Sequence, residues 1–113
     1  MSLGGIELRA VYAPGALLEL DEIADWTESK FGRERAQQYL SFLLNEISRL
    51  SSTPLLGTVL VDRPEYRFLP LRQRGRGHCH VVVYSLGNNL IEILHVFHSA
   101  QDWRGEATSA LID

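Results

Sequence analysis

The sequence has a single cysteine, little net charge and no long hydrophobic run, and each shortage excludes a class of protein. Cys79 has no partner for an internal disulfide, which is typical of a protein in the reducing cytosol. No apolar run approaches the roughly 20 residues that a membrane-spanning helix needs, so we expect a soluble, cytoplasmic protein with no membrane partner. The 11 basic against 14 acidic residues argue against a domain that coats nucleic acid through bulk charge.

The apolar content that is present is sufficient for one compact core. A chain of 113 residues with 45% hydrophobic content is too short for two ordinary domains, so we expect residues 1–113 to fold as a single domain. The basic residues, although few, are unevenly distributed. Five arginines lie between residues 62 and 80, and they are Arg63, Arg67, Arg72, Arg74 and Arg76. The sequence therefore predicts a local basic patch on an otherwise acidic protein.

The first half of the chain is predicted to form one strand followed by two helices. Residues 6–12 alternate apolar and polar side chains, as a half-buried strand does. A helix is predicted to begin at Pro14 and to end at Gly32, since proline suits the first turn and glycine the carboxyl end. Its apolar stripe consists of Leu17, Leu20, Ala24, Thr27 and Phe31, widened by Ile23 and Trp26, and that of the next helix consists of Ala36, Leu40, Leu43, Ile47 and Leu50. Both stripes, with Tyr39 beside the second, are wider than a partner helix requires, so we expect a sheet to cover them as core.

The second half is predicted to supply that sheet. Residues 55–64 form a predicted loop, and a strand at 66–72 is expected at an edge because Pro70 cannot donate a ladder hydrogen bond. The segments HVVVYS at 80–85 and LIEILHVFH at 90–98 are predicted central strands, joined by a turn at 86–89. Residues 99–113 form a predicted tail with one short helix. The predicted fold class is α+β, in the order strand, helix, helix and three strands, with an antiparallel helical hairpin on a small, mainly antiparallel sheet.

The carboxy-terminal half, from YRFLPLRQRGRGHCH through VVVYSLGNNLIEILHVFHSAQDW, resembles the RelE/ParE family of small bacterial toxins. Its last hairpin is similar to that of ParE-like members, which have a tyrosine-ended apolar strand, a turn, and a strand that leads to an aspartate-tryptophan pair. Two positions depart from that pattern, because His95 and Gln101 stand where arginine is common. If positive charge at these positions serves the activity, toxicity would be weakened or redirected, whereas the fold assignment would stand.

The resemblance implies the toxin of a type II toxin-antitoxin (plasmid stabilization) system. ParE-like members poison DNA gyrase without a known cleavage chemistry, so the implied protein is a binding protein more than an enzyme, and it needs no cofactor. Its implied partners are DNA gyrase and an antitoxin whose carboxy-terminal segment wraps the toxin, in a homodimer or a toxin-antitoxin hetero-oligomer. Two alternatives stay open: a RelE-like, ribosome-dependent endoribonuclease that cleaves mRNA, and a non-toxic binding module of the same fold.

In this family setting, the basic patch predicts a contact surface for the target or the antitoxin. An arginine fork binds carboxylate and phosphate oxygens in pairs, although the same charges could simply keep an edge strand from pairing. Three histidines and the tail join this predicted surface, whose members are Arg67, Arg72, Arg74, Arg76, His78, His95, His98, Asp102 and Trp103. For Trp103 the sequence favours packing against the sheet or the helices over an exposed anchor.

Cleavage of RNA would require a base, an acid and a cation around the reacting phosphate. The resemblance to RelE-like nucleases would assign these tasks to His80, Tyr84, His98 and Arg74. The favoured interpretation is different: His80 and His98 are partly buried strand histidines whose nitrogens are satisfied by backbone carbonyls. A metal site at His78 and His80 is not expected, because no cysteine pair accompanies them.

Overall fold

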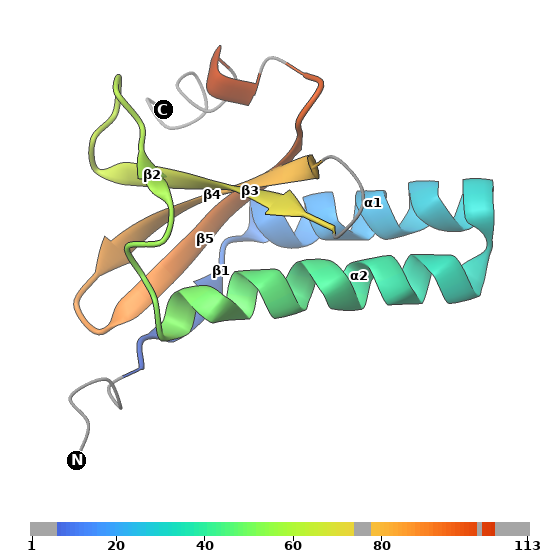
Figure 1. Ribbon diagram of the computed structural model, residues 1–113, viewed down its shortest axis with the longest axis horizontal. Helices are drawn as coiled ribbons and strands as arrows, with labels where there is room; N and C mark the ends of the chain where they lie inside the picture. Colours follow the sequence, from blue (N-terminus) through green and yellow to red (C-terminus); the bar gives the residue numbers. More distant parts are fainter. Residues whose placement is uncertain (1–6, 74–77, 102, 106–113) are drawn as a thin grey trace.

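The computed structural model describes residues 7–73, 78–101 and 103–105, without the side chains of residues 78 and 79, and consists of a helical hairpin and a sheet (Figure 1). The elements are β1 (Arg9–Tyr12), α1 (Pro14–Phe31), α2 (Arg33–Ser48), the 3-10 turn η2 (Arg49–Ser51), β2 (Thr58–Val59), β3 (Tyr66–Arg72), β4 (His78–Gly87) and β5 (Leu90–His98). Residues 103–105 are also helical. Of the helices in these ranges, none has the length and apolarity to cross a membrane.

The five strands form one sheet in the order β1-β5-β4-β3-β2. All neighbours are antiparallel except β1 and β5, whose parallel register runs from Arg9 opposite Leu90 to Tyr12 opposite Ile93. This arrangement confirms the predicted α+β fold and its mainly antiparallel sheet. It also confirms that the two most apolar segments are central strands: Val81, Val82 and Val83 are all buried, so both faces of β4 are covered.

The turn between β4 and β5 is tighter than predicted. β4 continues through Gly87, which leaves only Asn88 and Asn89 to connect the strands. Asn89 has a φ of 62°, in the left-handed region that asparagine tolerates better than most residues. The same tolerance explains the other reversal of the chain, where Gly32 links α1 to α2 with a φ of 93°.

Two predictions about the β3 side of the sheet were wrong. Residues 55–64 are not all loop, because Thr58 and Val59 form β2 and pair with Phe68 and Arg67. As a consequence β3 is not the edge strand. Pro70 is nevertheless tolerated, because β2 ends before it. The Tyr66 carbonyl accepts a hydrogen bond from the Leu60 N–H, so the backbone groups of Tyr66 face the β2 side. Pro70 lies four residues further along β3, so its nitrogen faces the same side. Since β2 does not extend to Pro70, no ladder hydrogen bond is required of it there.

The core lies on both faces of the sheet. The helix-facing cluster joins α1 and α2 to the strands and comprises Ala16, Leu20, Leu43, Ile47, Leu50, Leu71, Val82, Tyr84, Ile91, Ile93 and Val96. The opposite face carries a smaller cluster of Leu60, Val81, Val83, Phe97 and Trp103. Trp103, 9% exposed, closes this second face, which confirms that it packs against the sheet.

The predicted stripe of α2 is buried except for the half-buried Leu40, but that of α1 is buried only in part. Trp26 and Phe31 are each 59% exposed and Leu17 is 51% exposed, so their assignment to the core was wrong. Leu17 projects about 100° around the helix from the fully buried Ala16. Trp26 and Phe31 lie near the far end of the hairpin, which extends past the sheet in Figure 1. The sheet therefore covers only part of the apolar surface that the helices present.

The loop before β2 is fixed to the centre of the sheet by Tyr84. Its hydroxyl donates to the Pro54 carbonyl and accepts from the Gly57 N–H, both at 2.8 Å. A Cβ atom at residue 57 would lie 2.6 Å from this hydroxyl, so the approach requires glycine. Arg67 completes the attachment by donating from Nη1 to the Gly57 carbonyl at 2.8 Å.

We expect Tyr84→Phe to lower the free energy of unfolding by about 1 to 3 kcal/mol, because it leaves the Gly57 N–H and the Pro54 carbonyl without their partner. Urea denaturation measures the change. Tyr12→Phe is the matched control, since no hydrogen bond to the Tyr12 hydroxyl occurs among the described residues, and it should cost less than about 0.5 kcal/mol. Equal losses in the two variants would contradict the role given to Tyr84.

Candidate functional site: the hairpin groove

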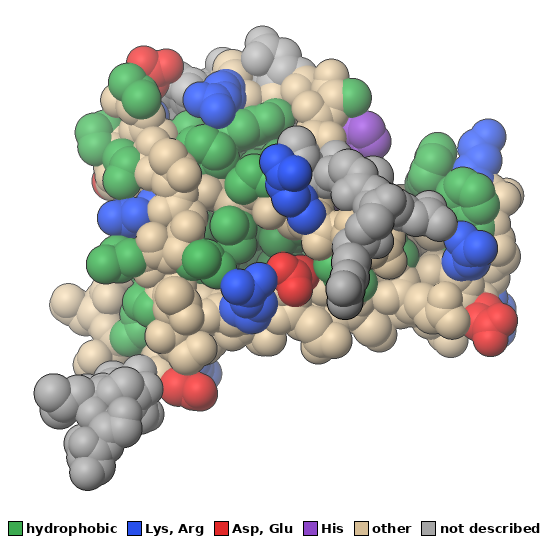
Figure 2. Space-filling model, viewed as in Figure 1, with side chains coloured by type: hydrophobic (Ala, Val, Ile, Leu, Met, Phe, Trp, Pro, Cys, Tyr) green, Lys and Arg blue, Asp and Glu red, His purple; other side chains and the backbone are tan. Residues whose placement is uncertain are grey.

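A groove of about 970 Å³ opens where the helical hairpin extends past the sheet. We call it the hairpin groove. Its lining comes from both helices, the ends of β4 and β5, and the following turn: Glu19, Glu22, Ile23, Trp26, Thr27, Phe31, Arg35, Gln38, Tyr39, Gln73, His80, Val96, Phe97, His98 and Gln101. Figure 2 shows hydrophobic and basic side chains gathered at the far end of the hairpin. Trp26 and Phe31 meet edge to face there, with ring centroids 6.2 Å apart.

The β4 side of the groove contains a hydrogen-bonded pair, Tyr39 and His80. The Tyr39 hydroxyl oxygen lies 2.6 Å from Nδ1 of His80, so this histidine is satisfied by a side chain and not by the backbone carbonyl that was expected. Burial lowers the pKa of His80 to about 4, and the neighbouring His98 adds to the effect. His80 is therefore a neutral polar group at neutral pH.

The α1 side of the groove is organised by Glu19. β1 pairs with β5 only as far as Ile93, so the edge of β5 is open beyond that residue. Glu19 covers part of this edge: its Oε1 accepts from the Val96 N–H at 2.8 Å, and its Oε2 lies 3.1 Å from Nδ1 of His95. The His95 ring also stacks on Phe97 at 4.7 Å. His95 is thus held against α1 and the strand instead of projecting freely.

The turn after β5 fixes the orientation of His98. The backbone N–H of Ala100 donates to Nδ1 of His98 at 3.0 Å, and the backbone N–H of His98 donates to Oε1 of Gln101 at 2.8 Å. The His98 ring is exposed and meets the ring of His80 edge on, with centroids 5.2 Å apart. Two histidines far apart in the sequence therefore lie side by side at one wall of the groove.

The other residues predicted to make contacts are dispersed. Arg67 is half-buried and bonded to Gly57, and Arg72 is exposed at the end of β3. Trp103 lies on the opposite face of the sheet, 4.9 Å from Phe68 and under the guanidinium of Arg104. Arg74, Arg76 and Asp102 lie outside the described residues, as does the side chain of His78. Among the members of the predicted surface that the structure describes, only His98 lines the hairpin groove, and His95 is bonded to Glu19.

Sequence reasoning missed most of the groove, and the residues it missed include Glu22, Trp26, Phe31, Arg35, Gln38 and Tyr39. The aromatic members were visible as part of an unusually wide apolar stripe, but they were assigned to the core. The width of an apolar stripe does not show whether the chain's own sheet covers it or whether it stays exposed as a binding surface.

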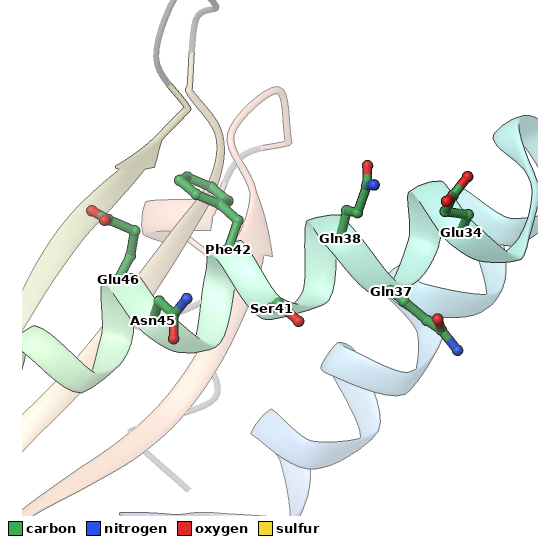
Figure 3. Close-up of a pocket in the computed structure, with 7 residues that line it drawn as sticks. All are labelled: Glu34, Gln37, Gln38, Ser41, Phe42, Asn45 and Glu46. Carbon is green, nitrogen blue, oxygen red and sulfur yellow. The ribbon is translucent and has the colours of Figure 1, made fainter.

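A second hollow lies on the outer face of α2 and has a different character. It is lined by Glu34, Gln37, Gln38, Ser41, Phe42, Asn45 and Glu46, all from one helix. Figure 3 shows these side chains leaving α2 in different directions, without converging on a common point. A surface of this kind lacks the convergent polar groups that a ligand site needs.

Two of the residues considered for catalysis, Tyr84 and His80, are engaged in contacts within the fold. The Tyr84 side chain is fully buried and its hydroxyl holds the loop before β2, while His80 is neutral and bonded to Tyr39. This geometry argues against a proton-transfer role for either residue. Within residues 7–73, 78–101 and 103–105, no group of His, Cys, Asp or Glu side chains is arranged to hold a metal ion.

The fold first defines a class: small α+β proteins in which a helical hairpin packs on one face of a mainly antiparallel sheet. A more specific assignment follows from known proteins. Residues 10–103 match the family described as "ParE toxin of type II toxin-antitoxin system, parDE". The chain is 31% identical over 96 residues to Toxin ParE1 of Mycobacterium tuberculosis, in strains CDC 1551/Oshkosh and H37Rv. The aligned region covers 83% of this chain and 92% of the relative. This chain belongs to the ParE toxin family of type II toxin-antitoxin systems.

A solved structure shares the fold. The structure titled "Chromosomal ParDE TA system from P. aeruginosa" superposes with a TM-score of 0.71 at 17% identity, covering 83% of this chain and 98% of that one. At this level of identity the likeness concerns the arrangement of the elements alone.

The environment of His80 predicts a specific dependence of stability on pH. Because its pKa falls from 6.5 to about 4 on folding, the unfolded chain takes up the proton first as the pH is lowered. The free energy of unfolding should therefore fall between about pH 6.5 and pH 4, and level off below. After allowance for solvent screening, we expect His80 to account for about 1 to 2 kcal/mol.

Urea denaturation of the wild type and His80→Gln at about pH 7 and about pH 4.5 isolates this contribution, since glutamine takes up no proton. The wild type should lose more stability than the variant over this interval. An equal loss in both chains would show that His80 is not responsible.

Proposed function

We propose that this chain is a toxin that inhibits bacterial DNA gyrase by binding it and that is neutralised by an antitoxin encoded beside it. Membership of the ParE family supports the toxin assignment, and the related P. aeruginosa structure carries the name of a ParDE system. On this proposal residues 1–113 act as one domain in the bacterial cytoplasm, and the chain needs no cofactor.

The hairpin groove is the observation that supports an antitoxin partner most directly. Trp26 and Phe31 are large aromatic side chains, each 59% exposed, on the rim of an open groove. Exposed tryptophan in a groove is typical of binding hot spots, and an amphipathic segment in an apolar groove is a recurring mode of peptide recognition. We infer that the carboxy-terminal segment of the antitoxin occupies the groove.

The groove also leads to the predicted basic patch. Gln73 and His80 border the groove, and Arg72 follows on β3, whose edge is open beyond its short pairing with β2. A segment that leaves the groove on this side would reach Arg72 and could pair with the free part of β3. One bound segment could thus cover the groove, the patch and a strand edge together.

Inhibition by binding is favoured over RNA cleavage. A RelE-like mechanism would need a base and an acid, but Tyr84 is committed to the loop before β2 and His80 is buried and neutral. Binding needs only complementary surface, which the groove and the exposed Arg72 offer.

The purified chain is expected to inhibit supercoiling by bacterial DNA gyrase, and an equimolar amount of the co-encoded antitoxin should relieve the inhibition. A gel-based supercoiling assay measures both effects, with the heat-unfolded chain as control. Cleavage of mRNA in a translation extract, without an effect on gyrase, would favour the nuclease alternative. A chain inactive in both assays and harmless when expressed alone would favour the non-toxic binding module.

We expect Trp26→Ala to weaken antitoxin binding roughly 30-fold, the loss typical of a hot-spot residue. Leu18→Ala is a closely matched control, because Leu18 is 60% exposed on the same helix but does not line the groove. It should change the affinity less than about threefold. Titration calorimetry measures both constants, and comparable effects of the two substitutions would exclude the groove as the docking site.

A further inference from the structure

The hydrogen bonds around His98 determine which of its nitrogens faces a partner. A backbone N–H can only donate, so Nδ1 of His98 must accept from Ala100 and carries no proton. The neutral ring therefore has its proton on Nε2. No hydrogen-bond partner of Nε2 occurs among the described residues, and the exposed ring lines the groove. His98 offers a fixed donor to whatever occupies the groove.

Arg35 on α2 offers a second donor to the groove. It lies in the first turns of α2, is exposed and lines the groove. In the part of the chain that the structure describes, it forms no ion pair. Glu19 also lines the groove, and both of its carboxylate oxygens are engaged, one with the Val96 N–H and the other with His95.

We propose that the hairpin groove selects its partner by holding a carboxylate of the bound segment between Nε2–H of His98 and the guanidinium of Arg35, with an apolar side chain of the same segment against Trp26 and Phe31. This inference rests on the proposed docking of the antitoxin segment in the groove. His98 and Arg35 are then specificity-determining residues, because they distinguish an acidic segment from an equally apolar neutral one.

The remaining groups of the groove are consistent with a carboxylate at this position. His80 lies beside His98 but is bonded to Tyr39 and neutral, so it neither repels nor attracts the charge strongly. Glu22 of α1 is the second acidic residue that lines the groove. Unlike Glu19, it has no hydrogen-bond or ion-pair partner among the described residues. It disfavours a more highly charged anion such as phosphate and favours a basic residue elsewhere on the segment.

Two substitutions at His98 distinguish the Nε2–H donor that faces the groove from the Nδ1 acceptor that holds the Ala100 N–H. His98→Gln places an amide N–H near the position of Nε2 but loses the acceptor for Ala100. His98→Asn places an oxygen near Nδ1, which keeps that acceptor, but loses the donor to the groove. A role confined to the 98–101 turn would make the glutamine variant the worse binder, whereas the proposal predicts the reverse.

The experiment measures binding of the co-encoded antitoxin by titration calorimetry to the wild type, His98→Asn, His98→Gln, Arg35→Gln and Arg33→Gln. Arg33 is the matched control, since its side chain is 77% exposed, pairs with Glu28 at 3.9 Å and does not line the groove. We expect His98→Asn and Arg35→Gln each to weaken binding about tenfold, the effect of losing a hydrogen bond to a charged group. His98→Gln and Arg33→Gln should each cost less than about threefold.

A set of antitoxins with each Asp or Glu of the carboxy-terminal segment changed to Asn or Gln then identifies the acceptor. In a double-mutant cycle, one of these antitoxin changes should couple to His98→Asn and Arg35→Gln. Once that acidic residue has been replaced, neither toxin substitution should weaken binding any further. The proposal is wrong if no acidic position couples to either residue while Trp26→Ala still weakens binding. Failure of the proposed function is a different result, in which Trp26→Ala has no effect.

Discussion

The helical hairpin is longer than the sheet on which it packs, and the hairpin groove exists because of this mismatch. At 1.5 Å per residue the 18 residues of α1 span about 27 Å. The first half of α1 is anchored on the sheet through Ala16 and Leu20, whereas Trp26 and Phe31 in the second half are each 59% exposed. Because α1 and α2 are joined by the single residue Gly32, they extend together, and both helices line the groove.

The β4–β5 hairpin holds the parts of the molecule in place. Val82 and Tyr84 of β4 enter the core beneath the helices, and Tyr84 also fixes the loop that leads to β2. β5 carries His95 and Val96, which bind Glu19 of α1, and it ends in the turn that orients His98. The strands thus determine both the position of the hairpin and the polar groups at the mouth of the groove.

These connections assign different tasks to the histidines of the chain. His80 is a buried neutral group of the groove wall and His95 joins β5 to α1, so His98 is the one of these three described side chains that presents a fixed donor. At position 95, where the family resemblance led us to expect arginine, the histidine is engaged with Glu19. The departure from the family pattern at this position therefore affects the contact between α1 and β5, as well as the charge of the surface.

Much of the fold could be predicted from the sequence, because periodicity and turn residues act locally. The apolar runs at 80–85 and 90–98, the proline at the start of α1 and the glycine after it were sufficient for the element order. The two-residue β2 was missed because its pairing depends on contacts with β3 that no local pattern encodes. The groove was missed for a related reason: Trp26 and Phe31 follow the helical period of core residues, but the sheet ends before it reaches them.

The most direct test of the groove as a docking surface is amide hydrogen exchange of the chain with and without the proposed antitoxin. Exchange should become slower on binding in the segments that form the groove, at residues 22–39 and 96–101, with a smaller effect on the outer edge of β1. Protection confined to β1 or to the carboxyl end of α2, with residues 22–39 unchanged, would contradict the central claim that the overhanging hairpin is the docking surface.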